Sequence, residues 1–226
     1  MINDSGWRRR NIWEHSSQVR ELYARRCRLE AEEMTCHAQA ARLLRPMVAA
    51  GDTLLDAGCG SGYFYHSLRR HGLSVDYYGI DATECLIEIG RAAMPAHGLP
   101  ATRLRTMRIE DLDGQVDHVV CVNVLSNLDN YHRPLERLLQ VAAKSVVIRE
   151  SLHEHASYAY VKDRFLDDGV DLRVHVNSYP IAEVSAFMAS HGFMVSQVID
   201  ERTGDVPEMV IGYPHYWKFL VGSRTT

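Results

Sequence analysis

Long apolar runs are missing from this chain of 226 residues, so nothing in it predicts a membrane-spanning helix. The stretch Met1–Arg10 is polar and basic, and no apolar core follows it, which argues against a secretory signal. We therefore expect a cytoplasmic protein without a membrane partner.

Paired metal and redox motifs are also absent. The five cysteines include no C-x-x-C spacing, and the twelve histidines include neither H-x-x-x-H nor H-E-x-x-H. Asn123 and Asp129 alone are too few oxygen ligands for a catalytic magnesium ion. These absences predict reduced thiols and no metal cofactor.

An excess of positive charge is missing as well. Lysine and arginine number 25 against 29 acidic residues, a formal net charge of −4, which leaves no electrostatic footprint for nucleic acid. The chain lacks internal repeats and low-complexity tracts, and its length suits one domain over residues 1–226. A small molecule is the expected partner.

What the chain does contain is an alternation of strand-like and helix-like segments, which is typical of an α/β fold with a parallel sheet. Helical spacing from Trp13 to Val48 predicts two helices, an N-terminal cap within residues 1–50 that precedes a core over 51–226. Strands are expected at Thr53–Ala57, Ser74–Ile80, Arg103–Ile109, Val116–Val124 and Ser145–Arg149. Helices are expected at Ser61–Arg70, Thr83–Met94 and Arg133–Ala143.

The C-terminal part predicts one more helix and a pair of strands. Pro180 suits the first position of a helix that Gly192 ends. No helix separates the strand-like segments Phe193–Ile199 and His215–Val221, so they should pair as an antiparallel hairpin at the sheet edge.

An irregular insert covers residues 151–179. Within it Val170, Leu172, Val174 and Val176 alternate with polar residues, the period of a half-buried strand. Such a strand would line the substrate cavity, pair across a homodimer, or pack on the sheet as a solvent-covered excursion, and the sequence leaves these choices open.

The most informative motif follows the first predicted strand. Gly58, Gly60 and Gly62 stand at alternate positions, where they allow positive φ and let a ligand lie against bare backbone at a helix start. Asp56 ends the strand just before them. A carboxylate there would attract an amino group more naturally than a phosphate.

This D-x-G-x-G-x-G stretch, Asp56 to Gly62, resembles motif I of the class I S-adenosylmethionine-dependent methyltransferases, and the resemblance covers roughly residues 40–223. It implies a Rossmann-like, mostly parallel seven-stranded sheet with helices on both faces. It also implies S-adenosylmethionine as cofactor, S-adenosylhomocysteine as product, and cofactor contacts from Asp56, Gly58, Cys59, Gly60 and Gly62.

Asp81 ends the second predicted strand, where a carboxylate can accept hydrogen bonds from both hydroxyls of a ribose. The alternative is an ordinary helix N-cap. The segment Arg108–Leu112 resembles the family's D-x-E-D-L, with Arg108 in place of the first acid. The resemblance implies that the Ile109 amide and Glu110 contact the adenine, whereas a solvated charge run is the competing interpretation.

Asn123 lies near the end of the fourth predicted strand, and the resemblance places it beside the methionine part of the cofactor. Ser126-Asn127 then stands where many relatives have Glu-His, so a family-type general base is missing there. Tyr23 and Arg26 share one face of an N-terminal helix and are candidates to bind the cofactor's carboxylate, although an arginine-rich helix can also be simply solvated.

Methyl transfer from a sulfonium is an in-line displacement, so positioning in a water-poor site supplies much of the acceleration. An alcohol or phenol acceptor would add the need for a general base. His153, just after the fifth strand, is the candidate base, and the candidate substrate residues are His155, Tyr158, Tyr160, Tyr131 and Tyr213.

These features predict a methyltransferase that acts on an oxygen or nitrogen of a small molecule. One alternative is a non-catalytic S-adenosylmethionine-binding protein. Another is a short-chain NAD(P)-dependent oxidoreductase, because Tyr158-Ala-Tyr-Val-Lys162 matches Y-x-x-x-K with Ser145 upstream, although the glycine motif does not fit that family.

Overall fold

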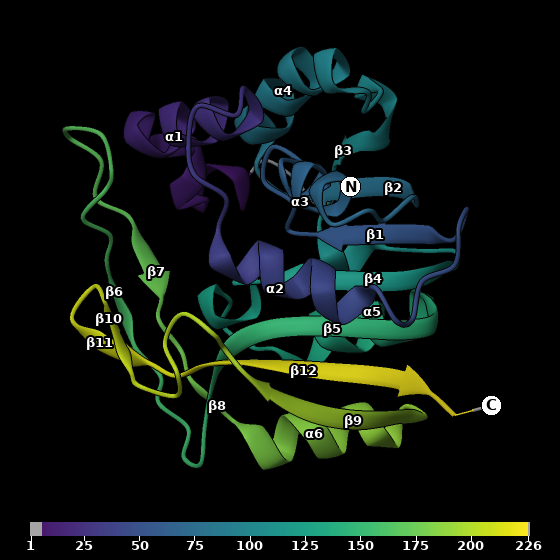
Figure 1. The fold of residues 1–226 in the computed structure, drawn as a ribbon. Coiled ribbons are helices and arrows are strands. Elements are labelled where there is room, and N and C mark those ends of the chain that lie inside the picture. The colour runs from purple at the N-terminus through teal and green to yellow at the C-terminus, as the bar shows by residue number, and fades with distance from the viewer. Residues whose placement is uncertain (1–5, 226) are drawn as a thin grey trace.

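The structure is a computed structural model that describes residues 6–225, apart from the side chain of Arg8. Its centre is a sheet with the strand order β3-β2-β1-β4-β5-β12-β9, and β8 pairs with β5 beside this path (Figure 1). The strands are β1 (Thr53–Ala57), β2 (Asp76–Asp81), β3 (Leu104–Thr106), β4 (Val116–Val122), β5 (Ala142–His153), β8 (Tyr179–Pro180), β9 (Phe193–Ile199) and β12 (Trp217–Arg224).

The pairing confirms the predicted Rossmann-like arrangement. Strands β1 to β5 are parallel to one another, and β12 runs antiparallel to both β5 and β9. The strand β1 lies between β2 and β4, so the direction of winding reverses there. In open α/β sheets this reversal leaves a crevice at the carboxyl ends of the strands, where ligands bind.

Helices cover both faces of the sheet, because successive strand residues point to opposite sides. Val119 and Val146 belong to the core under α5 and α6, whereas Val120 and Val147 belong to the core under α2 and α3. The α-helices are α1 (Ser17–Cys27), α2 (Thr35–Leu44), α3 (Phe64–Arg70), α4 (Glu84–Ala93), α5 (His132–Val141) and α6 (Ile181–Ser190). Short 3-10 helices are η1 (Arg8–Arg10), η2 (Ile12–His15), η3 (Met94–His97), η4 (Ala101–Arg103), η5 (Ile109–Asp111) and η6 (Leu125–Asn127).

Two small hairpins lie beyond the end of the central sheet, on the side of α1 (Figure 1). The first pairs β6 (Tyr160–Lys162) with β7 (Arg173–His175), so part of the alternating stretch around Val174 forms a strand that pairs within its own chain. The second pairs β10 (Glu208–Val210) with β11 (Tyr213–His215) between β9 and β12. The sequence pattern predicted no strand over residues 208–210.

Several boundaries differ from the predicted ones. The strand β5 continues to His153 because Ser151 pairs with Trp217 and Leu152 pairs with Tyr179. Pro180 precedes α6 as its N-cap instead of forming its first residue. Within residues 6–225 no helix is long and apolar enough to cross a bilayer, and the same residues contain no group of three potential metal ligands.

Candidate functional site

The turn after β1 has the backbone that the three glycines allow. Gly58, Gly60 and Gly62 all have positive φ, at 77°, 57° and 77°. A Cβ at Gly60 would collide with the ring of Tyr23, and one at Gly62 would lie 2.7 Å from Leu104 Cδ2. Larger residues are therefore excluded by both conformation and space.

Asp56 lies at the end of β1 and is 5% exposed. The Tyr77 hydroxyl donates to Asp56 Oδ2 over 2.6 Å, and the carboxylate forms no ion pair with any cation in residues 6–225. Burial raises the pKa of Asp56 to about 7. A buried carboxylate without a cation costs free energy that a bound ammonium group would recover.

Asp81 joins the glycine turn to the start of α4. Its Oδ2 accepts from the Gly60 amide over 2.8 Å, and its Oδ1 accepts from the Thr83 amide over 2.7 Å. Burial raises the pKa of Asp81 as well. The N-cap position belongs to Thr83, so Asp81 tethers two backbone segments and still borders the adjoining cavity.

A cavity of about 970 Å³ opens where the carboxyl ends of β1, β2 and β4 meet. It brings together nine of the eleven residues predicted to bind the cofactor. These nine are Tyr23, Arg26, Asp56, Gly58, Cys59, Asp81, Ile109, Glu110 and Asn123. Gly60 and Gly62 shape the turn behind the lining.

Arg26 enters the cavity from α1. Its Nη1 donates to the Tyr63 hydroxyl over 2.9 Å, and its guanidinium carbon lies 5.0 Å from the centre of the Tyr63 ring. No acidic side chain in the described part of the chain pairs with Arg26. Burial raises the pKa of neighbouring Tyr23 to about 12, so its hydroxyl stays a donor at neutral pH. This corner suits a ligand carboxylate.

Asn123 follows β4 with a positive φ of 61°. The buried Arg149 donates from Nη1 to Asn123 Oδ1 and from Nε to Asp200 Oδ2, the latter over 2.7 Å. Because a guanidinium only donates, it fixes the oxygen of the Asn123 amide on its own side. The amide nitrogen of Asn123 is thereby left for the cavity.

The adenine candidates have mixed surroundings. Ile109 is buried, and Glu110 Oε1 lies 3.4 Å from Arg108 Nη2 in a half-exposed ion pair. Both Arg108 and Glu110 line the cavity. The pairing explains how arginine is accommodated at the position of the family's acid.

Comparison with known proteins agrees with this geometry. Residues 55–148 match the family model of the methyltransferase domain. Residues 55–148 thus resemble a methyltransferase domain, and the match covers less than half of the chain. A ubiquinone biosynthesis O-methyltransferase of Acinetobacter baumannii (strain ACICU) is 32% identical over 83 residues, 35% of this chain and 34% of that protein. The chain thus matches about a third of the length of this curated relative.

Solved structures show the same fold across nearly the whole chain. Magnesium protoporphyrin IX methyltransferase from Synechocystis PCC 6803, with bound SAM, has a TM-score of 0.57 at 17% identity, covering 99% of this chain and 93% of that one. The 1,6-didemethyltoxoflavin-N1-methyltransferase of Burkholderia thailandensis has a TM-score of 0.60 at 14% identity, covering 88% and 81%.

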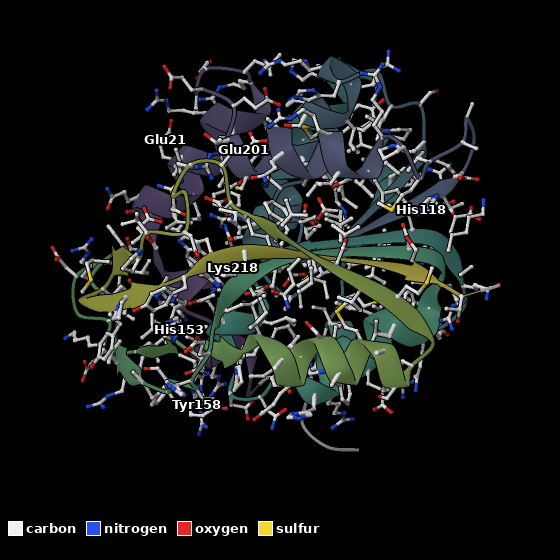
Figure 2. The ribbon with its side chains drawn as sticks, turned by 60° about the horizontal axis from the view of Figure 1, so that its bottom comes forward. Glu21, His118, His153, Tyr158, Glu201 and Lys218 are labelled. Atoms are coloured by element: carbon white, nitrogen blue, oxygen red, sulfur yellow. The ribbon has the colours of Figure 1, made fainter. Side chains whose placement is uncertain are left out.

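Most residues predicted to contact the methyl acceptor lie away from the cavity. His153 stacks on Tyr216 with ring centres 4.0 Å apart, because β5 carries it past the sheet edge. Tyr158 is 63% exposed and lies at the periphery in Figure 2. His155 is also exposed, whereas Tyr131 is buried against Tyr179 in the core.

Of these predicted residues, Tyr160 alone lines the cavity. Tyr213 lies on β11, outside the lining. The structure therefore gives no support to a general base at His153. The histidines that do line the cavity are His37, His175 and His215. Burial lowers the pKa of His37 to about 3, so this ring is neutral.

The oxidoreductase alternative finds no assembled site. Ser145 Oγ bonds His118 Nδ1 over 2.7 Å at the start of β5, and His118 and Tyr158 lie at opposite ends of the molecule in Figure 2. Lys162 pairs with Asp171 on the surface. The three residues of that motif therefore do not come together in one site.

The sequence did not predict the residues that other parts of the chain bring to this cavity. Trp13 precedes α1, Met34 is the N-cap of α2, His37 lies in α2, and Trp217 begins β12. Tyr63 had a usable signal, since it follows Gly62 directly. The others reach the cavity only through the tertiary fold.

Glu150 is another residue that the sequence did not single out, and it holds the loop after β4. Its Oε1 accepts from the amides of Val124 and Leu125, both over 2.8 Å, and its Oε2 accepts from the amide and hydroxyl of Ser126 over 2.9 Å and 2.8 Å. This buried carboxylate holds the loop that contains Asn127, and Asn127 lines the cavity.

Proposed function

We propose that the protein transfers the methyl group of S-adenosylmethionine to an oxygen or nitrogen of a small-molecule acceptor in the cytoplasm. The observation that carries this proposal is a pair of carboxylates, the buried Asp56 and the partly buried Asp81, on either side of a positive-φ glycine turn at the cavity. That arrangement offers sites for an ammonium group and a ribose beside bare backbone.

The residues present fit the cofactor group by group. Asp56 would hold the amine, Asp81 the ribose hydroxyls, and Arg26 with Tyr23 the carboxylate. Ile109 and Glu110 would border the adenine, and Asn123 the methionine chain. When bound, the cofactor supplies an electrophilic methyl on a sulfonium.

The rest of the chain positions the acceptor and excludes water. The segment before α1 contributes Trp13, the hairpin β6–β7 contributes Val174, and the region of β10–β11 contributes Val210 to the cavity wall. Three covering segments of this kind suit a small acceptor better than a polymer. The names of the similar proteins also refer to small molecules: ubiquinone biosynthesis, magnesium protoporphyrin IX and 1,6-didemethyltoxoflavin.

The direct test is calorimetric titration of the purified protein with S-adenosylhomocysteine. We expect Asp56→Asn to weaken binding roughly tenfold or more, because the ammonium loses a charged partner. Glu21→Gln is the matched control, since Glu21 is exposed on α1 and should leave affinity unchanged. Wild-type protein without affinity for S-adenosylhomocysteine would refute the proposal.

Binding alone does not distinguish an enzyme from a sensor. Formation of S-adenosylhomocysteine from S-adenosylmethionine, followed across a panel of phenols, amines and carboxylic acids, separates the two. Acceptor-dependent turnover supports the enzyme, and binding without turnover on the whole panel favours the sensor.

A further inference from the structure

A second, smaller cavity of about 270 Å³ lies beside the first. Its walls are mostly apolar, with Val19 and Leu22 from α1, Phe165 and Val176 from the insert, and Ile211 from the turn between β10 and β11. It shares with the larger cavity the residues Trp13, Tyr23, Asn127, Val174 and Val210. The smaller cavity is therefore a side compartment of the proposed active site.

One acidic residue stands in this apolar wall. Asp163 is 4% exposed, and its Oδ1 accepts from the Phe165 amide over 2.6 Å. Its Oδ2 has no hydrogen-bond partner and no ion pair within residues 6–225. Because Asp163 lines the smaller cavity, this second oxygen is available to a molecule bound there.

Arg20 of α1 and the two basic residues that flank Asp163 in the sequence have other partners. Arg20 lies 3.3 Å from Asp167, Lys162 lies 3.0 Å from Asp171, and the Arg164 guanidinium lies 4.9 Å from the centre of the Phe165 ring. A buried carboxylate without a counter-charge is costly, and a carboxylate oxygen can only accept hydrogen bonds. The group that would complete this site is a donor, and a cationic donor compensates the burial best.

We propose that the smaller cavity binds the body of the methyl acceptor, and that this acceptor is a compact apolar molecule whose protonated amine pairs with Asp163. This inference rests on the proposed function, since it assigns the compartment to the acceptor. A cavity of about 150 Å³ is known to accommodate benzene, so the volume here suits one ring with a short side chain. Anionic molecules are disfavoured by the charge of Asp163.

The same geometry separates recognition from reaction. Asp163 lines only the smaller cavity, whereas the residues assigned to the cofactor, Tyr23 apart, line only the larger one. The amine that pairs with Asp163 is therefore the anchor of the acceptor. The methylated atom belongs at the opening between the cavities, beside Asn127 and Tyr23.

The test compares three ligands of one shape, 2-phenylethylamine, 2-phenylethanol and phenylacetate, with and without saturating S-adenosylhomocysteine. Ligand-observed NMR titrations give their affinities for the wild type, Asp163→Asn and the control Asp171→Asn. Asparagine keeps an oxygen for the Phe165 amide and removes only the charge. Asp171 is exposed in the same insert and pairs only with Lys162 on the surface.

We expect the wild type to prefer the amine over phenylacetate by roughly tenfold or more, and Asp163→Asn to lose that preference. Asp171→Asn should behave as the wild type. Leu22→Trp fills the compartment from an exposed helix position and should weaken all three ligands. The affinity for S-adenosylhomocysteine reports whether each variant is folded.

Three outcomes would overturn the inference: equal binding of amine and phenylacetate by the wild type, an unchanged amine affinity in Asp163→Asn, or no binding of the amine at all. If S-adenosylhomocysteine still binds in those cases, the proposed function survives. Loss of S-adenosylhomocysteine binding by the wild type would refute the proposed function instead.

Discussion

At the scale of single residues, the ionisation of Asp56 affects both the stability of the free protein and its affinity for a ligand. Burial raises its pKa to about 7, and the Tyr77 hydroxyl is its hydrogen-bond donor. A pKa near neutrality makes the ionised carboxylate costly without a ligand and useful with one. The effect has a definite sign that can be measured.

An unfolded aspartate has a pKa of about 4, so the folded protein holds this proton more tightly. The stability that Asp56 contributes is therefore complete below pH about 4 and is lost as the pH rises through about 7. We expect the melting temperature of Asp56→Asn to exceed that of the wild type by a margin that grows from pH 5 to pH 8. S-adenosylhomocysteine affinity of the wild type should rise over the same range, while that of Asp56→Asn stays flat. A constant margin and parallel affinities would contradict the assignment.

At the scale of elements, the loop between β4 and α5 depends on a neighbouring strand. Glu150 in β5 accepts four hydrogen bonds from Val124, Leu125 and Ser126. Three of these donors are backbone amides that the loop cannot pair internally. This carboxylate holds the start of the loop, and Asn177 and Tyr179 bond the carbonyl groups of the same loop.

Glu150→Gln should therefore destabilise the protein by about 2–4 kcal/mol, because the new amide nitrogen faces donors and leaves some of them unpaired. Urea unfolding followed by circular dichroism measures the change. Glu154→Gln, at an exposed position just beyond β5, is the control and should be neutral. A Glu150 variant as stable as the control would show that the loop holds itself.

The alternation of strands and helices was predictable because each βαβ unit carries its own periodic pattern and turn residues. The antiparallel pair β9 and β12 followed from the missing helix between them, and the structure confirms it. The length of β5 and the hairpin β10–β11 were not predictable. Their limits depend on pairing with distant segments, such as Trp217 beside Ser151, that local periodicity does not encode.

At the scale of the whole molecule, the cavity joins residues from the start, the middle and the end of the chain. Most of the site residues that could be predicted lie within a few positions of a strand end, as Asp56, Asp81 and Asn123 do, and the exceptions come from α1. The site residues that could not be predicted, such as His37 and Trp217, lie on elements whose packing against the rest of the fold decides where the side chains point. His153 shows the converse, since a position after a parallel strand did not place it in the cavity.

The same convergence gives the protein a built-in reporter. The chain has three tryptophans, Trp7, Trp13 and Trp217, and all three line the large cavity. A ligand that fills this cavity changes the surroundings of every tryptophan at once, so S-adenosylhomocysteine should produce a saturable change in intrinsic fluorescence. At a hundred times its dissociation constant it should also add about 2.7 kcal/mol to the free energy of unfolding, which raises the melting temperature by about 5–10 °C.

The two measurements must agree if the cavity is the binding site. Both should give one dissociation constant, and Trp13→Phe should reduce the fluorescence change while leaving most of the thermal shift. Tyr158→Phe, at an exposed position away from the cavity, should alter neither. A thermal shift without any fluorescence change would mean that the nucleoside binds elsewhere on the protein, because a ligand in this cavity cannot avoid all three indole rings.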